Sequence, residues 1–428
     1  MPDMSLPTST RSVLKNTEIL ELLPSHLVQE AASLDAADPL ADYRDKFIRT
    51  DGVVAYLDGN SLGRPLKATR DTLADFVDGA WGDRLIRAWD EQWMARPQML
   101  GDMLAGAVLG AAPEQTVVAD STTVMLYKLV RAALTARPGR TEIVADSENF
   151  PTDRYVLSGV AAELGLDIRW ISPNPALGVQ VEEVQELLSE RTALVALSHV
   201  AYKSAYISDL PAITTAAHSA GALVLWDLCH SAGVLELELD ATNVDLAVGC
   251  TYKYLNGGPG APAFGYVASH LQEDLVQPIP GWMGHADPFA MGPTYSPARG
   301  VRRFISGTPP ILGMLPVHEM LLLLEKAGMP AVRQKSVLLT SFATRIADDV
   351  LTPFGVVLAS PRDSRVRGGH VTFEHPAMES VVAGLWEIGV IPDFRPPRGL
   401  RAGLSPLSTS FTEVAVAMAH VQRLLSRR

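Results

Sequence analysis

The sequence is poor in the residues that mark several large classes of protein. Its 428 residues include 2 cysteines, Cys229 and Cys250, too few for a disulfide framework or a cysteine-rich metal cluster. No apolar run approaches the length of a membrane span, and residues 1–27 lack the apolar core of a secretory signal. The net charge of −12 argues against nucleic acid or an anionic membrane as the main partner. We therefore expect a cytoplasmic protein that binds no metal, no nucleic acid and no membrane.

The composition does supply enough apolar material for large cores. Hydrophobic residues make up 47% of the chain and charged residues 20%, as in ordinary globular proteins. Because 428 residues are too many for one ordinary core, we expect two domains, or a large domain with a smaller one.

From about residue 116 onward, short apolar runs alternate with helix-length segments. This alternation predicts a mainly parallel β-sheet covered by helices, with the chemistry beyond the carboxyl ends of the strands. A later helix, His318–Ala327, is expected to end at Gly328, and Ser410 with Glu413 resembles a capping box before a final helix. The expected strands are Thr116–Ala119, Glu142–Ala145, Leu166–Ile171, Ala193–Leu197, Ala222–Trp226, Val244–Val248 and Ala263–Ala268, and the expected helices are Val124–Thr135, Val181–Ser189, Leu210–Ser219 and Val414–Leu425.

An aspartate, Asp227, directly follows the apolar strand Ala222–Trp226. A carboxylate buried there needs a cation, since an unpaired buried charge is costly. The protonated ring nitrogen of a pyridine cofactor is one such cation, and an aspartate facing it keeps the ring able to accept electrons. The alternative is an aspartate that caps a helix beginning at Leu228.

A lysine, Lys253, follows the next apolar strand and precedes the glycine-rich segment Asn256–Gly260. Removal of a lysine from water favours its neutral amine, which is the form that reacts with an aldehyde. The glycines allow the backbone to approach a ligand closely. The alternative is a surface lysine whose amine reaches water, but the pairing with Asp227 favours a cofactor site.

The segment from Thr116 to Thr123 offers a site for a phosphate group. A strand, Thr116–Ala119, is followed by the polar turn Asp120–Thr123 and then at once by a helix. Free N–H groups at the start of a helix and the helix dipole attract anions. Ser and Thr are also ordinary helix caps, so this signal gains weight only beside Lys253.

An aromatic residue, Phe150, lies in the segment Asn149–Asp153 just beyond another expected strand. Its ring could lie against a cofactor ring. On the residues alone, a loop aromatic packed on the core is the preferred alternative.

Seven segments together form a recognisable pattern: Tyr56–Gly63, Trp81–Arg87, Asn149–Asp153, Trp226–Gly233, Gly249–Gly260, Gly281–His285 and Gly307–Pro310. In these segments the chain resembles the kynureninase family, within the aminotransferase-like group of pyridoxal 5′-phosphate (PLP) enzymes. The likeness extends from about residue 50 to residue 415. Cysteine desulfurases share the architecture of this group but not these segments.

The resemblance implies the architecture as well as the family. It implies an α/β protein of the PLP-dependent transferase-like class, also called aminotransferase fold type I, with a mainly parallel seven-stranded sheet in a large domain and a smaller α/β domain. Residues 1–75 would form an N-terminal segment that contributes to the small domain, residues 76–315 the large PLP-binding domain, and residues 316–428 the C-terminal small domain. It also implies a homodimer with shared active sites.

The resemblance further implies a role for individual residues. Lys253 would bind the cofactor covalently, Asp227 would face its ring nitrogen, and Tyr252 would reach the phosphate and relay protons. Arg401 would bind the α-carboxylate of the substrate, a geometry that suits a guanidinium. The implied catalytic residues are Lys253, Tyr252 and Asp227; the further cofactor-binding residues are Thr122, Thr123, Phe150, Asp153, Ser198 and His230, with Trp282 and Thr308 reaching the site of the partner; and the substrate-binding residues are Arg401, Ser61, Gly307 and Thr308.

The implied activity is a PLP-dependent hydrolysis. The Cβ–Cγ bond of L-kynurenine, or of a hydroxylated or methylated kynurenine, would be cleaved to an anthranilate and L-alanine, with Lys253 taking the α-proton and water adding to the γ-carbonyl. Alternatives are β-lyase or aminotransferase chemistry on another amino acid in secondary metabolism, or a PLP-binding protein without activity. Cys229 and Cys250 are expected to be small buried residues rather than nucleophiles.

Four positions depart from the family pattern. Ala201 stands where Asn is common, Met283 where Phe is usual, Ala402 where an aromatic is common, and Ser408 where Tyr is common. Each residue is smaller or softer than the one it replaces. Two interpretations stay open: neighbouring side chains repack the pocket, or a roomier pocket admits a ring-substituted kynurenine.

Overall fold

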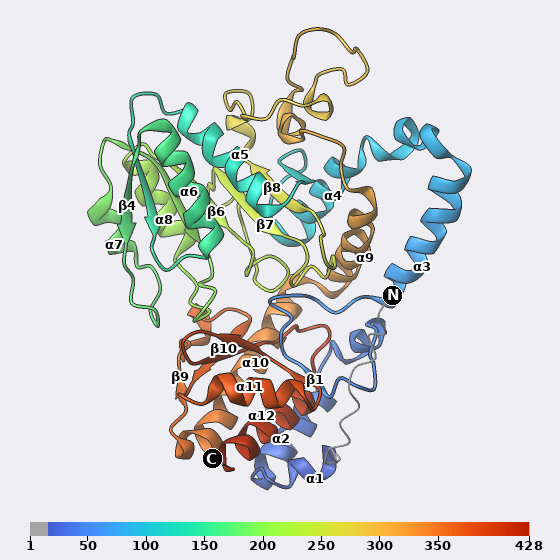
Figure 1. Ribbon diagram of the computed structural model, residues 1–428, viewed down its shortest axis with the longest axis vertical. Coiled ribbons are helices and arrows are strands. Elements are labelled where there is room, and N and C mark those ends of the chain that lie inside the picture. Colours follow the sequence, from blue (N-terminus) through green and yellow to red (C-terminus); the bar gives the residue numbers. More distant parts are fainter. Residues whose placement is uncertain (1–15, 428) are drawn as a thin grey trace, which may run out of the picture.

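The structure, a computed structural model, describes residues 16–427, which form a large upper region and a smaller lower region in the view of Figure 1. Residues 1–15 of the predicted N-terminal segment lie outside the described residues. Within the described residues, no helix combines the length and the apolar character that a membrane crossing requires.

The upper region is built on a seven-stranded sheet with the order β2-β8-β7-β6-β5-β3-β4 in residues 16–427. Strands β4, β3, β5, β6 and β7 run parallel, whereas β8 runs antiparallel to both β7 and β2. The predicted mainly parallel sheet is therefore confirmed. The strands are β2 (Thr116–Ala119), β3 (Glu142–Asp146), β4 (Asp167–Ile171), β5 (Thr192–Ser198), β6 (Leu223–Asp227), β7 (Leu246–Cys250) and β8 (Ala263–Val267).

A helix lies between each pair of successive strands from β2 to β6, as the alternation of segments predicted, whereas α3 and α4 precede β2 and α9 follows β8. Helix α5 packs against α6 and lies across strands β5 to β8, and α8 packs against β6 and α7. The helices are α3 (Lys67–Asp75), α4 (Arg96–Leu104), α5 (Thr122–Thr135), α6 (Pro151–Leu164), α7 (Val181–Leu187), α8 (Leu210–Ser219) and α9 (Ile311–Ala327).

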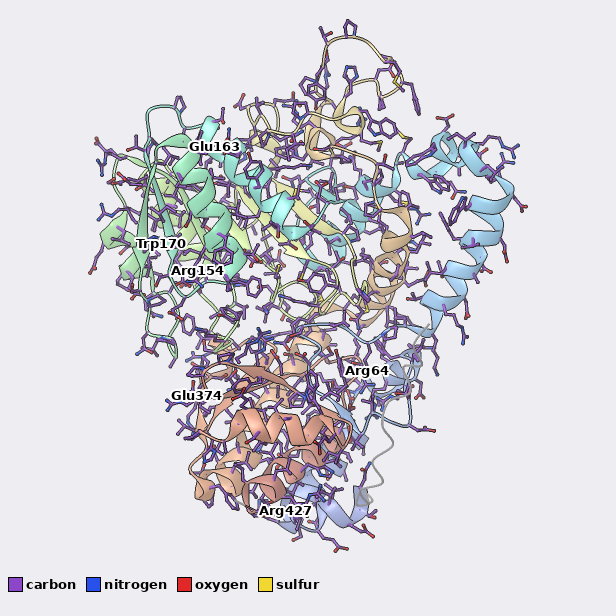
Figure 2. The ribbon with its side chains drawn as sticks, viewed as in Figure 1. Arg64, Arg154, Glu163, Trp170, Glu374 and Arg427 are labelled. Carbon is purple, nitrogen blue, oxygen red and sulfur yellow. The ribbon has the colours of Figure 1, made fainter. Side chains whose placement is uncertain are left out.

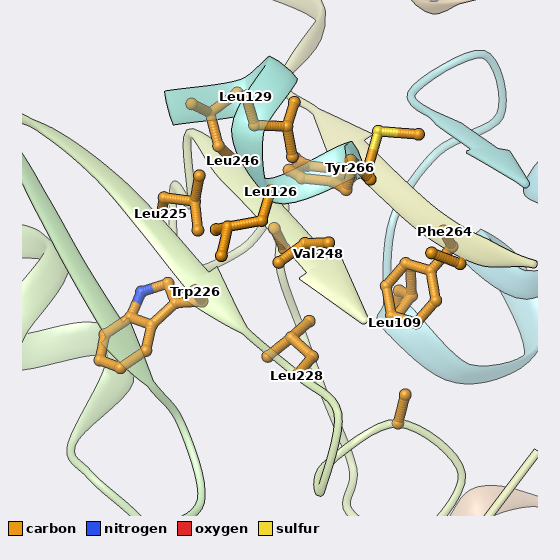
Figure 3. Packing of buried hydrophobic residues seen from close by; sticks show 14 of the residues in the cluster. Leu109, Leu126, Leu129, Leu225, Trp226, Leu228, Leu246, Val248, Phe264 and Tyr266 are labelled. Carbon is orange, nitrogen blue, oxygen red and sulfur yellow. The ribbon is translucent and has the colours of Figure 1, made fainter. Parts of the chain in front are cut away.

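Apolar side chains between α5 and the sheet form the core of the upper region (Figure 3). Leu126 and Leu129 of α5 are buried with Leu225 of β6 and Val248 of β7. Each fully buried side chain of this size contributes about 2 kcal/mol to stability. This packing holds the ends of β6 and β7 in a fixed relationship, which positions the residues that follow them.

The lower region combines a four-stranded antiparallel sheet, of order β12-β13-β10-β9, with helices from both ends of the chain. Helices α1 and α2 pack against the C-terminal helix α12 and share a core with it. The elements are α1 (Asn16–Leu20), α2 (Ser25–Ala36), α10 (Met329–Ile346), β9 (Val357–Leu358), β10 (His370–Glu374), α11 (Met378–Trp386), β12 (Asp393–Arg395), β13 (Gly399–Gly403) and α12 (Phe411–Leu425), with β1 (Ala55–Tyr56) paired to β11 (Val390–Ile391).

The segment Tyr56–Arg64 links the two regions; Arg64 is labelled where they meet in Figure 2. Glu413 of α12 accepts hydrogen bonds from the Tyr56 N–H and from Arg64 Nη2, both at 2.8 Å. On the other side, Gly63 donates its N–H to the Tyr252 carbonyl, and Asn256 Nδ2 donates to the Arg64 carbonyl, again at 2.8 Å. The segment therefore ties the C-terminal helix to the loop after β7.

The boundaries of some elements differ from those predicted. Helix α9 begins at Ile311, seven residues before the predicted start, and contains Pro316. Burial of its apolar face, which includes Met314, stabilises the helix by more than the missing backbone hydrogen bond at the proline costs. Strand β7 covers Leu246–Cys250 rather than residues 244–248. The Ser410 hydroxyl accepts from the Glu413 N–H at 3.0 Å, as in a capping box, but the Glu413 carboxylate binds Tyr56 and Arg64 instead. The domain boundaries at residues 75 and 315 stay predictions.

Candidate active site

A pocket lies beyond the carboxyl ends of β5, β6 and β7. It gathers nine of the predicted site residues from five segments of the chain, which confirms that strand ends and the start of α5 converge. The residues that line it are Thr122, Thr123, Phe150, Thr152, Asp153, Ser198, Val200, Tyr202, Asp227, Cys229, His230, Tyr252 and Lys253.

Lys253 projects into this pocket from the loop that follows β7. Its Nζ atom lies 3.2 Å from His230 Nε2 and 5.9 Å from the centre of the Phe150 ring. Burial, and then the charge of Lys253, lowers the pKa of His230 well below its ordinary value, so the imidazole is neutral and able to accept from the amine. His230 Nδ1 is buried and finds no hydrogen-bond partner within residues 16–427.

Asp227 ends β6 and faces the same pocket. Its Oδ1 accepts the Cys229 N–H at 2.7 Å, and the Ser198 hydroxyl lies 3.3 Å from Oδ2. The residues after Asp227 form turns from Cys229 to Val234 and no helix, so the alternative that Asp227 caps a helix is wrong. Although the Cys229 N–H and the Ser198 hydroxyl contact the Asp227 carboxylate, Asp227 still lines the pocket.

Asp153 is the second carboxyl group in the pocket and belongs to the first turn of α6. Burial first, and then the charge and a hydrogen bond of Asp227, raises the pKa of Asp153 well above its ordinary value. Two carboxyl groups that share a hydrogen bond do not readily carry negative charge at the same time, so Asp153 keeps its proton more readily beside Asp227.

The N-terminus of α5 forms one wall of the pocket. Ser121 caps the helix, with its hydroxyl accepting the Val124 N–H at 3.4 Å, and the next residues, Thr122 and Thr123, line the pocket. The turn before the helix is held by Lys128, whose Nζ donates to Asp120 Oδ2 at 2.5 Å. Hydroxyls and the N–H groups at a helix start suit an anion.

Arg401 lies beside this pocket, on β13 of the lower region, and is buried. Its Nη1 donates to the carbonyl of Tyr202, a pocket residue, and its Nη2 donates to Ser61 Oγ and Asp393 Oδ2, each at 2.7 Å. Burial, and then the charge of Arg395, lowers the pKa of Arg401 to about 10, so the guanidinium still carries its charge at neutral pH. Ser61, which the resemblance also assigns to substrate binding, thus contacts the arginine.

Three predicted residues lie away from the Lys253 pocket. Trp282 packs edge-on against Trp89, with ring centres 6.0 Å apart, and lines a separate pocket with neighbours from residues 280–295. Gly307 and Thr308 are exposed. Within one chain these residues do not reach Lys253, and their contribution to the site of a partner stays a prediction.

Several residues of the site were not predicted. Tyr202 lines the pocket, its ring lies 5.5 Å from that of Phe150, and its carbonyl binds Arg401. Tyr202 lies only four residues beyond the end of β5, so the rule that places sites at strand ends could have found it. Asp393, which binds Arg401, and His370, whose ring centre lies 5.5 Å from that of His230, carry no such sequence signal, because only the lower sheet brings them near.

The four departures from the family pattern lie outside the lining of this pocket. Met283 is buried in the upper core, and Ala402 is buried in the lower core. Ser408 is buried, and its carbonyl accepts from Arg49. Ala201 is half-buried and donates its N–H to the Tyr206 carbonyl. Their positions give no support to a roomier pocket.

Comparison of the sequence with known families identifies relatives over most of the chain. A family model described as "Kynureninase C-terminal domain" matches residues 332–421, and one described as "Cys/Met metabolism PLP-dependent enzyme" matches residues 110–299. The kynureninase of Pseudomonas fluorescens is 40% identical over 408 residues, which cover 93% of this chain and 95% of the relative. The kynureninase of Burkholderia mallei (strain SAVP1) is 40% identical over 404 residues, with the same coverage.

Comparison with solved structures confirms the predicted fold class. The apo cysteine desulfurase of Thermococcus onnurineus NA1 superimposes with a TM-score of 0.79 at 18% identity, covering 90% of this chain and 98% of the other. The cysteine desulfurase CsdA of Escherichia coli gives a TM-score of 0.75 at 22% identity, covering 91% and 98%. The chain thus has the fold of PLP-dependent enzymes of fold type I.

The side chains of the pocket fit PLP. They comprise an amine for its aldehyde, a buried carboxylate for its ring nitrogen, and a helix start with two threonines for its phosphate. The unpartnered Nδ1 atom of the buried His230 shows that the pocket offers polar capacity that the described protein groups leave unused. Within residues 16–427, no cluster of acidic, histidine or cysteine side chains suits a metal ion. With relatives at 40% identity along 93% of its length, the chain belongs to the kynureninase family and depends on PLP.

Proposed function

We propose that this chain hydrolyses the Cβ–Cγ bond of L-kynurenine and releases anthranilate and L-alanine. The observation that carries the proposal is the convergence of Lys253, Asp227 and the start of α5 on one pocket, with Arg401 bound to the carbonyl of the pocket residue Tyr202. Together with the kynureninase relatives, this arrangement favours an α-amino acid substrate whose carboxylate binds an arginine.

Each wall of the pocket would hold one part of the cofactor. Thr122 and Thr123 would bind the phosphate at the start of α5, Phe150 would stack on the ring, and Asp227 would face the ring nitrogen. When bound, PLP supplies an electron sink that stabilises negative charge on the substrate carbons. Ser198 supports this arrangement, because its hydroxyl contacts both Asn149 and Asp227.

Lys253, Tyr252 and Arg401 would act on the substrate. The Lys253 amine would take the α-proton, aided by the neutral His230 at 3.2 Å. Burial raises the pKa of Tyr252 above its ordinary value, so its hydroxyl keeps its proton and can donate it to the phosphate or to a substrate carbon. Arg401, with Ser61 beside it, would fix the α-carboxylate and so orient the scissile bond.

We also propose a cytoplasmic homodimer in which a second copy of the chain completes the site. Trp282, Gly307 and Thr308 lie away from Lys253 within one chain, although the resemblance assigns them to cofactor and substrate. Trp282 and the exposed Thr308 are therefore expected to reach the pocket of the partner. Analytical ultracentrifugation should show a dimer. Trp282→Ala should weaken the binding of PLP, because the tryptophan is expected to reach the cofactor site of the partner.

The activity is tested by product analysis with the PLP-loaded protein. L-kynurenine, 3-hydroxykynurenine and a ring-methylated kynurenine should each be assayed for the aromatic acid and for L-alanine by mass spectrometry. Borohydride treatment should label Lys253, and Lys253→Ala should lose at least 10³-fold in kcat, of the order that loss of a catalytic group costs. Pyruvate or a transamination product in place of alanine would overturn the proposal.

A further inference from the structure

One carboxylate, Asp393, lies between two arginines beside the pocket. Its Oδ2 atom is 2.7 Å from Arg401 Nη2 and 2.6 Å from Arg395 Nε. Asp393 and Arg401 are directly opposite one another in the antiparallel pairing of β12 with β13. The backbone therefore fixes the contact between these two residues, and Arg395, two positions along the same strand, shares the carboxylate.

Arg401 has few N–H groups left for a substrate. A guanidinium carries five N–H donors. Within residues 16–427, Arg401 donates to Tyr202 O, Ser61 Oγ and Asp393 Oδ2. The orientation of the Asn60 amide that satisfies its neighbours adds a fourth contact, because its oxygen then accepts from Arg401 Nε at 3.0 Å.

One free N–H is too few for the two parallel hydrogen bonds that an arginine makes to a carboxylate. At least one present partner must leave when an α-carboxylate binds. The carbonyl of Tyr202 is backbone and the side chain of Asn60 is fully buried, so neither moves easily. The Ser61 hydroxyl is neutral and, in the proposed function, stays beside Arg401 when the substrate binds. Asp393 is 19% exposed and carries the same charged group as the incoming substrate.

Arg395 is a second cationic partner for the Asp393 carboxylate. Its side chain is 29% exposed, and its guanidinium lies 5.9 Å from the centre of the Tyr202 ring, so it flanks the pocket wall. A carboxylate released from Arg401 keeps its ion pair with Arg395 and is not left unpaired.

We propose that Asp393 competes with the α-carboxylate of the substrate for Arg401, and that Arg395 retains Asp393 when the substrate displaces it. Asp393 is thus a residue that sets substrate affinity, in addition to the arginine that binds the carboxylate. The inference rests on the proposed function, because it takes Arg401 as the carboxylate-binding residue. Competition from Asp393 makes the protein bind carboxylate ligands more weakly than it would if Arg401 had no such partner.

The decisive variant is Asp393→Asn in the PLP-loaded protein. Removal of the competing charge should lower KM for L-kynurenine and the Kd for L-alanine about tenfold, while kcat changes less than twofold, since a hydrogen bond to a charged group is worth about 1.5 kcal/mol or more. L-alaninamide, which lacks the carboxylate, should bind both proteins equally. L-alanine and L-alaninamide binding is followed by the visible absorption of the loaded protein.

Arg395→Gln provides the second arm. It should raise KM about fivefold in the wild-type background, because Asp393 then has Arg401 as its one cation, and should change KM less than twofold in the Asp393→Asn background. Asp363→Asn, which removes an exposed carboxylate paired with Arg365, is the matched control and should leave KM unchanged. Because Asp393→Asn takes a counterion from the buried Arg401, its thermal midpoint should fall, and KM and Kd are therefore compared well below that midpoint.

The outcomes separate the inference from the proposed function. A rise in KM in Asp393→Asn, an unchanged KM, or equal gains for L-alanine and L-alaninamide would each overturn the inference, because Asp393 would then merely position Arg401 or shift the general charge. If wild type releases no anthranilate but binds L-alanine more weakly than Asp393→Asn does, the proposed function fails and the inference stands.

Discussion

The amine of Lys253 and the Nε2 atom of His230 lie 3.2 Å apart, just beyond the ends of two neighbouring parallel strands. Their spacing follows from the pairing of β6 with β7, in which Asp227 lies opposite Val248. Because burial keeps His230 neutral, the imidazole is able to accept from the amine and does not add a second positive charge. The Lys253 amine is therefore contacted by a residue that lies three positions beyond the end of the neighbouring strand.

Replacement of His230 by Phe should weaken PLP binding. The variant keeps an aromatic ring but removes the hydrogen bond to Lys253 and the unpartnered Nδ1 atom. Loss of one such bond is worth about 1 kcal/mol, or roughly fivefold in affinity. Equilibrium dialysis measures the affinity, and His26→Gln, at an exposed histidine, is the control. An affinity equal to that of wild type would show that the 3.2 Å contact has no part in holding the cofactor.

Replacement of Glu413 by Gln should destabilise the junction between the two regions. Glu413 and Arg64 are both buried and lie 2.8 Å apart, so the variant leaves a buried guanidinium without its counterion. Loss of one partner from a buried pair costs about 3 kcal/mol. Urea unfolding should show a lower midpoint. The midpoints are compared directly, because a chain of this length need not unfold in two states.

The control for this variant is Asp348→Asn, in an exposed pair with Arg362. It should shift the midpoint little, because exposed ion pairs contribute little to stability. Equal shifts in the two variants would mean that the Glu413 contact contributes no more than a surface pair.

The sequence was sufficient for the parts of the site that follow from local order along the chain. Asp227 ends one apolar strand and Lys253 comes shortly after the next, and parallel strands bring such positions to one edge. Thr122 and Thr123 follow a strand and open a helix, which local pattern also shows. These residues line one pocket, as predicted.

The surroundings of Arg401 could not be predicted in this way. Ser61 and Tyr202 are 340 and 199 residues away in sequence, and only the docking of the lower sheet brings them to the guanidinium. The side chain of Ala402 lies outside the Lys253 pocket for a related reason. Successive side chains of a strand point to opposite faces, so Arg401 faces the site while Leu400 and Ala402 enter the lower core.

Replacement of Gly63 by Ala should disturb the loop that carries Lys253. A Cβ atom at this position would lie 2.5 Å from the Lys253 carbonyl oxygen and 2.5 Å from the Asn256 amide, so the loop must shift. We expect kcat to fall about tenfold and the unfolding free energy to fall by about 1–3 kcal/mol, as for an overpacked site. Gly79→Ala, where nothing lies within 4 Å of the added atom, is the control. Full activity in Gly63→Ala would mean that the close approach is not needed to hold the lysine.

Replacement of His199 by Gln should flatten the pH dependence of stability below neutral pH. Burial, and then the charge of Arg333, lowers the pKa of His199 to about 4, against an ordinary value of 6.5. Between these values the unfolded chain binds a proton that the folded chain refuses, so the stability due to His199 is complete above pH 6.5 and is lost as pH falls. At pH 5 the loss is about 2 kcal/mol.

The measurement compares the fall in unfolding free energy from pH 7.5 to pH 5 in the two proteins. His199 also pairs with Ser231 at 2.9 Å, so the variant can be less stable at every pH without affecting the comparison. The quantity compared is the slope of unfolding free energy against pH. This slope should be smaller in His199→Gln, because one buried group no longer takes up a proton on unfolding. Identical slopes would show that the folded protein protonates His199 as readily as the unfolded chain does.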